Sequence, residues 1–305
     1  MPACGRGRLN PERATASRLL AAPVLVPAPF AGGALLDFLL RHAVAGVETG
    51  GVEADGTVRY ARTLNLPNGP ATLVLRWSDQ HLDLTLDADP RDHDEAVRRV
   101  HHLVDAGADP EAVDGHLARD PELAGLVTAT PGLRVPGVLD AREMLFRTLV
   151  GQQISLVAAR THGAALSRLH GRAVDSAEPG LERLFPTAEA FAAVDPTTLP
   201  MPRARGRALV GVAKRLLDGR LDLAVDAEPA AVRAQLLACP GIGPWTADYL
   251  LMRAHHAPDV LLRSDLIIAR ELAARPAADP SAWSPYRSYA NMHLWHAYLQ
   301  RSPAR

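Results

Sequence analysis

Cysteine, lysine and aromatic residues are all scarce in this chain of 305 residues. Its two cysteines, Cys4 and Cys239, are far apart and cannot supply the four thiolates of an iron–sulfur cluster or a zinc ribbon. They also imply no disulfide framework, which fits a reducing cytoplasm. The chain has a single lysine, Lys214, and aromatic residues make up 5% of it, so the position of each of these side chains is informative.

Long apolar runs are missing as well, and none of those present is long enough to cross a membrane. The N-terminal stretch LLAAPVLVPAPF follows several arginines in the manner of a secretion signal, but Pro23, Pro27 and Pro29 interrupt it. We therefore expect residues 1–27 to form a disordered tail, and the first folded element to begin near Phe30.

An excess of charge of one sign is also absent, because the formal net charge is −1. This net charge is not typical of a nucleic-acid-binding protein. A polyanion is attracted by the local electrostatic field, however, and not by the net charge. Acidic residues gather between Asp83 and Glu95, whereas arginines gather between Arg203 and Arg220. Hydrophobic residues make up 48% of the chain, which is typical of a globular protein with a large core.

The first part of the chain predicts a small antiparallel α+β domain over residues 28–90. Residues 33–44 have the pattern of a helix, and three strand-like stretches follow: GTVRYARTLNL, ATLVLRW and HLDLTLDAD. In the last of these, leucines alternate with polar residues, so one face is buried and the other is wet. Turns at residues 68–70 and 78–80 join the strands as hairpins.

From Asp92 onward the strand pattern disappears and helical signals continue to the end of the chain. We expect a mostly α protein in which two helical lobes surround a cleft. Residues 135–256 form one lobe, and residues 91–134 together with 257–305 form the other. A cleft of this kind is the expected place for a ligand.

The segment Pro240–Pro244 (PGIGP) separates two helical stretches and predicts a sharp hairpin. Glycines reach backbone angles that are closed to other residues, and proline cannot continue the preceding helix. The second helix starts at once, with Trp245, Tyr249 and Met252 on one face. Its N-terminus exposes backbone N–H groups, which can bind a phosphate of nucleic acid without reading a base.

Asp265 follows the hairpin by about twenty residues and stands at the N-cap of the helix LIIARELAAR. Capping alone is the usual role of such a residue. The spacing from the hairpin, together with Trp245 and Tyr249 nearby, favours a functional role. The other acidic candidates are Asp259, which we interpret as a loop residue, and Asp248, which we place on a solvated helix face.

The pair PGIGPWTADY and LLRSD resembles the helix-hairpin-helix DNA glycosylase superfamily, and within it the family of DNA-3-methyladenine glycosylase II, the inducible alkylation-repair type. Three further stretches carry the closer resemblance: Pro131–Ser155 (PGLRVPGVLDAREMLFRTLVGQQIS), Leu199–Ala213 (LPMPRARGRALVGVA) and Trp283–His296 (WSPYRSYANMHLWH). Together they cover roughly residues 28–300, and such an ordered set is far more specific than a lone glycine-rich turn.

The resemblance implies that the chain hydrolyses the N-glycosidic bond of alkylated purines in duplex DNA, with Asp265 as the catalytic carboxylate. Relatives that also cut the DNA backbone carry a nucleophilic lysine at the start of the second hairpin helix, where this chain has Trp245. The sequence therefore predicts a monofunctional hydrolase that uses water. The lack of cluster cysteines also separates it from the cluster-bearing branch of the superfamily.

The base pocket implied by the resemblance consists of Trp245, Tyr249 and Trp295, and Phe38 would complete it. Stacking of an electron-rich ring on a cationic alkylpurine is worth about 0.5–2 kcal/mol. Core packing is the alternative for each of these residues, and for Phe38 it is the interpretation we favour.

Contacts to the DNA backbone are expected from the hairpin, through Gly241, Ile242, Gly243 and Thr246. Gln152 and Gln153 occupy the loop that resembles the wedge which fills the gap left by an everted base. Some relatives have a bulky apolar residue there, so the polar Gln153 leaves a simple helix cap as the alternative.

We expect double-stranded DNA with alkylated bases as the partner of a monomeric protein near the cytoplasmic nucleoid, with no cofactor and no membrane contact. His255, His256, His293 and His296 lack an evident further ligand, so we interpret them as structural residues or residues at the rim of the site, and predict no metal site there. A monovalent cation on the hairpin carbonyls is compatible with the resemblance. The alternative functions are a DNA-binding module that has lost its chemistry, and a glycosylase for oxidised or mismatched bases.

Overall fold

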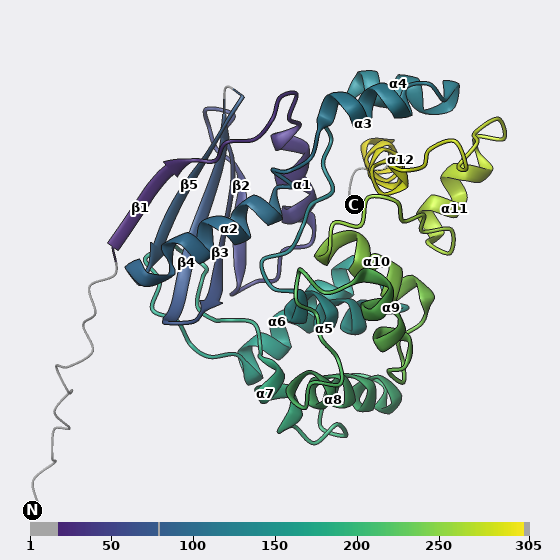
Figure 1. The fold of residues 1–305 in the computed structure, drawn as a ribbon. Helices are drawn as coiled ribbons and strands as arrows, with labels where there is room; N and C mark the ends of the chain where they lie inside the picture. Colours follow the sequence, from purple (N-terminus) through teal and green to yellow (C-terminus); the bar gives the residue numbers. More distant parts are fainter. Residues whose placement is uncertain (1–17, 79, 302–305) are drawn as a thin grey trace, which may run out of the picture.

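The computed structural model describes residues 18–78 and 80–301. It contains a five-stranded antiparallel sheet next to a larger helical part, as Figure 1 shows. This is the predicted mostly α architecture with a small N-terminal α+β unit. No helix within the described residues is both long and apolar enough to span a bilayer.

The sheet has the order β1-β5-β4-β3-β2, with β1 at one edge and β2 at the other. The strands are β1 (Arg18–Pro23), β2 (Glu48–Val52), β3 (Val58–Leu66), β4 (Gly69–Ser78) and β5 (His81–Ala88). In β5 buried and more exposed residues alternate along the strand, as the sequence predicts for a half-buried strand.

Part of the predicted tail is ordered, and that expectation was wrong for residues 18–23. These residues form β1, which pairs antiparallel with β5 so that Leu20 lies opposite Leu86. The prolines that argued against a folded element lie at the end of this edge strand and beyond it, where a missing N–H group does no harm to the ladder. Residues 1–17 lie outside the described residues.

Both predicted hairpins are present. The turn between β3 and β4 consists of Pro67 and Asn68, one residue earlier than the sequence suggests, because Leu66 pairs with Gly69. The turn between β4 and β5 follows Ser78, which pairs with His81. Its residue Gln80 has φ +66°, the left-handed conformation typical of tight hairpin turns.

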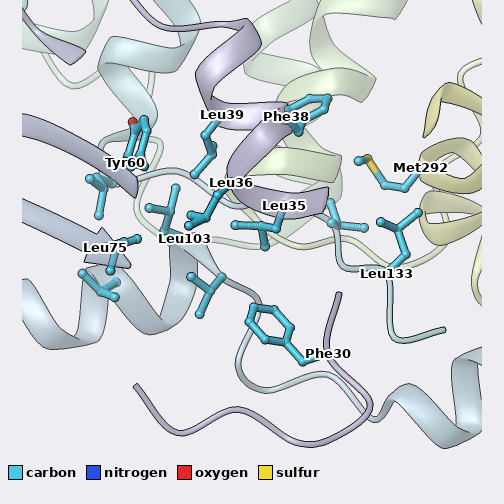
Figure 2. Close-up of a cluster of buried hydrophobic side chains, with 14 of the residues drawn as sticks. Phe30, Leu35, Leu36, Phe38, Leu39, Tyr60, Leu75, Leu103, Leu133 and Met292 are labelled. Carbon is cyan, nitrogen blue, oxygen red and sulfur yellow. The ribbon is translucent and has the colours of Figure 1, made fainter. Parts of the chain in front are cut away.

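Helix α1 (Gly32–Arg41) lies between the sheet and the C-terminal helix α12 (Arg287–Arg301). Figure 2 shows its leucines facing Tyr60 and Leu75 of the sheet and its other side facing Leu133 and Met292. The short helix η2 (Pro90–Asp92) and helix α2 (His93–Leu103) follow the sheet, and α2 also contributes buried residues to this cluster.

Helices α3 (Pro110–Leu117), α4 (Pro121–Ala129) and α11 (Leu266–Ala273) gather with α12 on one side of the molecule. Asp109 and Asp120 cap α3 and α4, each followed by a proline at the first helical position. Asp120 also accepts a hydrogen bond from the Nε1 of Trp283 (2.5 Å), which fixes α4 to the segment before α12.

The remaining helices form the second group, lower in Figure 1. They are α5 (Ala141–Gly151), α6 (Leu156–His170), α7 (Ala188–Ala192), α8 (Arg203–Leu217), α9 (Pro229–Leu237) and α10 (Pro244–Ala254).

Buried hydrophobic residues form two large clusters. One joins the sheet, α1–α4, α11 and α12, and the other lies among α5–α10. Helix α10 belongs to both, because Tyr249 and Met252 are part of the first cluster and Leu250 and Leu251 of the second.

Candidate active site

Asp265 lies at the N-cap of α11, where the sequence places it. Its Oδ1 accepts hydrogen bonds from the backbone N–H groups of Ile267 (2.9 Å) and Ile268 (3.0 Å). The indole Nε1 of Trp295 donates to the same oxygen (3.1 Å), and the Nε1 of Trp245 donates to Oδ2 (3.2 Å). The half-buried carboxylate is therefore fixed by one helix end and by two tryptophans from other helices.

The four predicted pocket aromatics lie together beside Asp265. The ring of Trp245 stacks on that of Tyr249, with centroids 5.1 Å apart, and Tyr249 meets Trp295 edge to face at 6.1 Å. Phe38 stacks with Trp295 at 6.5 Å. These rings come from α1, α10 and α12, so the tertiary fold and not the local sequence brings them together.

A cavity of about 400 Å³ opens between these elements, and Phe38, Trp245, Tyr249, Trp295 and Asp265 all line it. Its volume lies within the range of ordinary small-molecule sites and exceeds that of one purine. Phe38 is 8% exposed and belongs to the core as well as to the cavity wall, so both interpretations of this residue hold.

Arg253 lies behind the aromatic rings, and the sequence analysis missed it. Its guanidinium lies over the rings of Phe38 (4.9 Å) and Tyr249 (5.5 Å) and donates a hydrogen bond to the Tyr249 hydroxyl (2.7 Å). It also donates to the carbonyl groups of Pro136 and Gly137. Burial lowers the pKa of Arg253. The signal in the sequence was an arginine four residues after Tyr249, hence on the same helix face.

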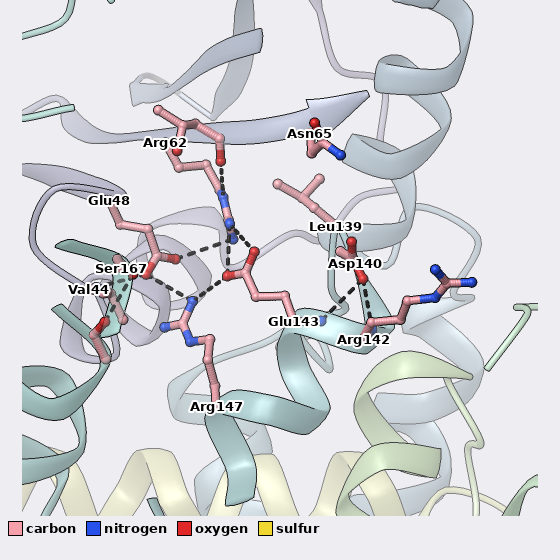
Figure 3. A network of polar contacts seen from close by, with 12 residues as sticks. Val44, Glu48, Arg62, Asn65, Leu139, Asp140, Arg142, Glu143, Arg147 and Ser167 are labelled. Atoms are coloured by element: carbon pink, nitrogen blue, oxygen red, sulfur yellow. Dashed lines mark hydrogen bonds and ion pairs between the residues drawn. The ribbon is translucent and has the colours of Figure 1, made fainter. Parts of the chain in front are cut away.

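Charged residues that the sequence analysis also missed form the cavity wall contributed by β2, β3 and α5. Figure 3 shows Glu48, Arg62, Glu143 and Arg147 in one network. Arg62 donates twice to Glu143 (2.9 and 2.7 Å), and Arg147 lies 2.9 Å from Glu48 and 3.0 Å from Glu143. Burial alone would raise the pKa of Glu48, but Arg147 and Arg62 beside it lower that pKa to about 2.

This network contains two carboxylates and two guanidinium groups, so it adds no net charge to the cavity. The only local signal for it was the spacing of four residues between Glu143 and Arg147, which is common on solvated helix faces and so carried little information.

The hairpin between α9 and α10 has the predicted conformation. Gly241 has φ +88°, and a Cβ added to it would lie 2.7 Å from the Cβ of Ala208. Gly243 is the N-cap of α10 and offers no side chain to its first N–H groups. Ile242 is buried in the cluster of α5–α10 and anchors the turn. Backbone N–H groups at this helix end therefore suit an anion.

Gln152 ties the loop between α5 and α6 to this hairpin. Its Nε2 donates to the Gly241 carbonyl (3.0 Å) and to the hydroxyl of Thr246 (3.2 Å), and the backbone carbonyl of Gln152 accepts a hydrogen bond from Arg205 (2.6 Å). The next residue, Gln153, is exposed and has φ +57°. Of the two predicted wedge residues, Gln152 faces the protein and Gln153 stands at the tip of the loop.

Hairpin carbonyl groups offer the oxygen ligands that a monovalent cation takes, although those of Cys239 and Gly241 already accept hydrogen bonds. The cation stays a prediction. In the described part of the chain no group of three or more His, Cys, Asp and Glu side chains could hold a metal ion. His256 contacts Asp105 (3.1 Å) and stacks on His102, and His293 is buried in α12.

The competing aspartates are engaged elsewhere. Asp259 forms a two-pronged ion pair with Arg287 (2.6 and 2.7 Å), and Asp248 pairs with Arg233 (2.6 Å). Neither lines the cavity.

Comparison with known proteins finds relatives that are described as AlkA or as DNA-3-methyladenine glycosylases. Residues 25–140 match the family described as AlkA N-terminal domain. The chain is 37% identical over 296 residues to a protein of Mycobacterium tuberculosis described as a probable bifunctional transcriptional activator/DNA repair enzyme AlkA, a match that covers 93% of this chain and 58% of that protein. It is 32% identical over 279 residues to DNA-3-methyladenine glycosylase 2 of Escherichia coli, covering 88% of this chain and 94% of that protein.

Solved structures show the same architecture. The 3-methyladenine DNA glycosylase of Archaeoglobus fulgidus aligns with a TM-score of 0.74 at 17% identity, covering 93% of this chain and 100% of that chain. MBOgg1 in complex with a low-affinity DNA ligand aligns with a TM-score of 0.68 at 17% identity, and the match covers 85% of this chain and 94% of that chain. The fold is therefore that of the helix-hairpin-helix glycosylases. The chain belongs to the DNA-3-methyladenine glycosylase 2 (AlkA) family.

Proposed function

We propose that this protein is a monofunctional DNA glycosylase that removes alkylated purines from duplex DNA. The observation that carries the proposal is Asp265, which two indole N–H groups and a helix N-terminus hold at the edge of an aromatic cavity. Family membership supports it, since the relative in Escherichia coli is named for 3-methyladenine. The chain spans 58% of the length of the mycobacterial relative, and the proposal concerns only the part that matches.

The chemistry follows from the geometry of Asp265. As the base leaves with the electron pair of the glycosidic bond, positive charge grows on the sugar, and a fixed carboxylate beside it stabilises that charge. Water supplies the new bond to C1′ and loses its proton to the carboxylate. Oδ1 accepts three hydrogen bonds and Oδ2 only one among the described residues, so Oδ2 is the oxygen that faces the reaction.

The pocket suits a cationic base. Trp245, Tyr249, Trp295 and Phe38 offer ring faces, and a cation over an aromatic face gains about 0.5–2 kcal/mol. A cationic alkylpurine departs as a neutral base, so the rings stabilise the bound lesion without reading a specific pattern of hydrogen bonds. The same property speaks against a preference for neutral oxidised bases.

The hairpin would hold the DNA backbone beside the lesion through the N–H groups near Gly243 and the hydroxyl of Thr246, with Gly241 and Ile242 shaping the turn. The exposed Gln153 would fill the gap that the everted nucleotide leaves. The protein would act as a monomer on DNA in the cytoplasm.

The variant Asp265→Asn tests the proposal on methylated duplex DNA, with base release measured by mass and abasic sites counted separately. The amide keeps the shape of the carboxylate but carries no charge. We expect DNA affinity to change less than about twofold and base release to fall at least about 100-fold, as is usual when a charge-stabilising group is lost. Full retained activity of the variant would refute the mechanism, and a wild-type protein that binds DNA without releasing bases would support the non-catalytic alternative.

A further inference from the structure

His42 follows Phe38 by one helical turn and lines the same cavity. Its ring lies 4.4 Å from that of Phe38, with an angle of 33° between the planes, so it continues the row of rings that runs from Trp295 through Phe38.

The hydrogen bond of His42 fixes which ring nitrogen carries the proton. Its Nδ1 lies 2.7 Å from the carbonyl oxygen of Phe38, and because a carbonyl only accepts, Nδ1 must donate. Burial, aided by the nearby charges of Arg253 and Arg147, lowers the pKa of His42 to about 4. At neutral pH Nε2 is therefore an unprotonated acceptor, and none of the described residues donates a hydrogen bond to it.

Other polar groups on this wall are occupied. Glu143 accepts from Arg62 and Arg147, and Glu48 accepts from the Tyr60 hydroxyl (2.6 Å) and pairs with Arg147. The carboxylates of Glu143 and Glu48 therefore already accept hydrogen bonds from other side chains of the protein. His42 differs from them because it combines a place on the cavity wall with an acceptor that the protein leaves unused.

The place of His42 relative to Asp265 determines which part of a base it meets. Asp265 must lie beside the sugar, at the end of the base that carries the glycosidic bond. The opposite end of a purine is its six-membered ring, with the exocyclic group at position 6. Trp295 donates a hydrogen bond to Asp265, Phe38 stacks on Trp295, and the tilted ring of His42 packs against Phe38, so two rings separate His42 from Asp265 along the cavity wall.

We infer that His42 is a specificity-determining residue whose Nε2 accepts a hydrogen bond from the 6-amino group of an everted adenine-type lesion. A guanine-type lesion presents a 6-oxo acceptor at this position and would place two acceptors face to face. An alkylated adenine spreads its positive charge onto the amino group, and a neutral imidazole accepts from that group without repelling the base. This inference rests on the proposed function.

The test compares 3-methyladenine with 3-methylguanine, which carry the methyl group on the same ring atom and differ at position 6. Both are released from the same methylated duplex and are identified by mass. His42→Phe keeps a ring against Phe38 but has no acceptor, and we expect it to lower kcat/KM for 3-methyladenine about tenfold, the factor that corresponds to about 1.4 kcal/mol. Release of 3-methylguanine should not fall, because the variant also removes the acceptor that would face its 6-oxo group.

His42→Gln serves as the matched variant, because its amide oxygen can accept near the position of Nε2, and it should keep most of the preference for 3-methyladenine. Thermal unfolding of both variants controls for the fold. An unchanged ratio of the two bases in His42→Phe, or an equal fall for both bases in both variants, would overturn the inference. The proposed function fails separately, if the wild-type protein releases neither base.

Discussion

At the scale of the residue, the site depends on how firmly one carboxylate is held. Asp265 accepts two backbone and two indole hydrogen bonds, and a group restrained in this way need not reorganise when charge develops beside it. Trp245 and Trp295 thus have two functions, because the same side chains present their ring faces to the cavity.

The two functions of Trp295 can be separated with Trp295→Phe, which keeps an aromatic ring but loses the N–H donor to Oδ1. We expect kcat for base release to fall about tenfold, which corresponds to a loss of about 1.4 kcal/mol of transition-state stabilisation, while the affinity for methylated DNA stays nearly constant. Single-turnover release and a binding titration would measure the two effects.

Trp283→Phe is the matched control, because Trp283 also donates its indole N–H to an aspartate, Asp120, and neither of these two residues lines the cavity. This control should lower stability and leave the single-turnover rate unchanged. Equal rates for Trp295→Phe and the wild-type protein would show that the indole hydrogen bond does not position the carboxylate.

Sequence reasoning predicted those cavity residues that a local pattern or the family resemblance identifies. Asp265, Trp245 and Tyr249 are tied to the hairpin by short spacing, and Trp295 and Phe38 came from the family resemblance. His42, Arg253 and the network around Glu143 were missed, because their partners are distant in the sequence and only the packing of α1, α5 and α10 brings them together.

At the scale of the element, the hairpin between α9 and α10 depends on one glycine more than on the other. Gly241 combines a left-handed φ with contact to Ala208, whereas the Cβ of a residue at Gly243 would meet no atom within 4 Å. The sequence motif does not distinguish the two glycines, but in the structure only Gly241 occupies a conformation and a space that other residues cannot easily adopt.

We therefore expect Gly241→Ala to lower the free energy of unfolding by about 1–3 kcal/mol, because strain in φ adds to the steric clash. Gly243→Ala should change it by less than about 1 kcal/mol. Urea denaturation monitored by circular dichroism compares the two variants directly. Equal losses would mean that α8 moves aside and relieves Gly241.

The edge strand β1 shows where element prediction fails in this chain. Its residues Leu19–Ala22 carry no alternation, and the proline-rich continuation led to the prediction of a tail. Pairing with β5 decides its conformation, and this partner lies about 65 residues away in the sequence.

At the scale of the whole molecule, we expect buried and half-buried histidines to make the stability depend on pH. Burial lowers the pKa of His42, His102 and His293 to about 4, whereas an unfolded histidine titrates near 6.5. Between these values the unfolded chain binds more protons than the folded chain, so stability rises with pH there and falls on acidification.

We expect the free energy of unfolding to decrease steadily from about pH 7 to about pH 4, and to decrease further below the ordinary pKa of a glutamate as Glu48 loses its pairing with Arg147 and Arg62. Urea titrations at several pH values measure the slope. His42→Phe should make the slope between pH 7 and pH 4 shallower, and a slope unchanged by this variant would mean that His42 titrates normally in the folded protein.

The position of α10 links the unfolding of either hydrophobic cluster to the loss of the cavity. One helix carries part of the cavity wall, begins at the hairpin and supplies residues to both hydrophobic clusters. If either hydrophobic cluster unfolds, α10 loses part of its packing, and we expect Trp245 and Tyr249 to move away from Asp265. We therefore expect a partly unfolded copy to lack a formed cavity beside Asp265.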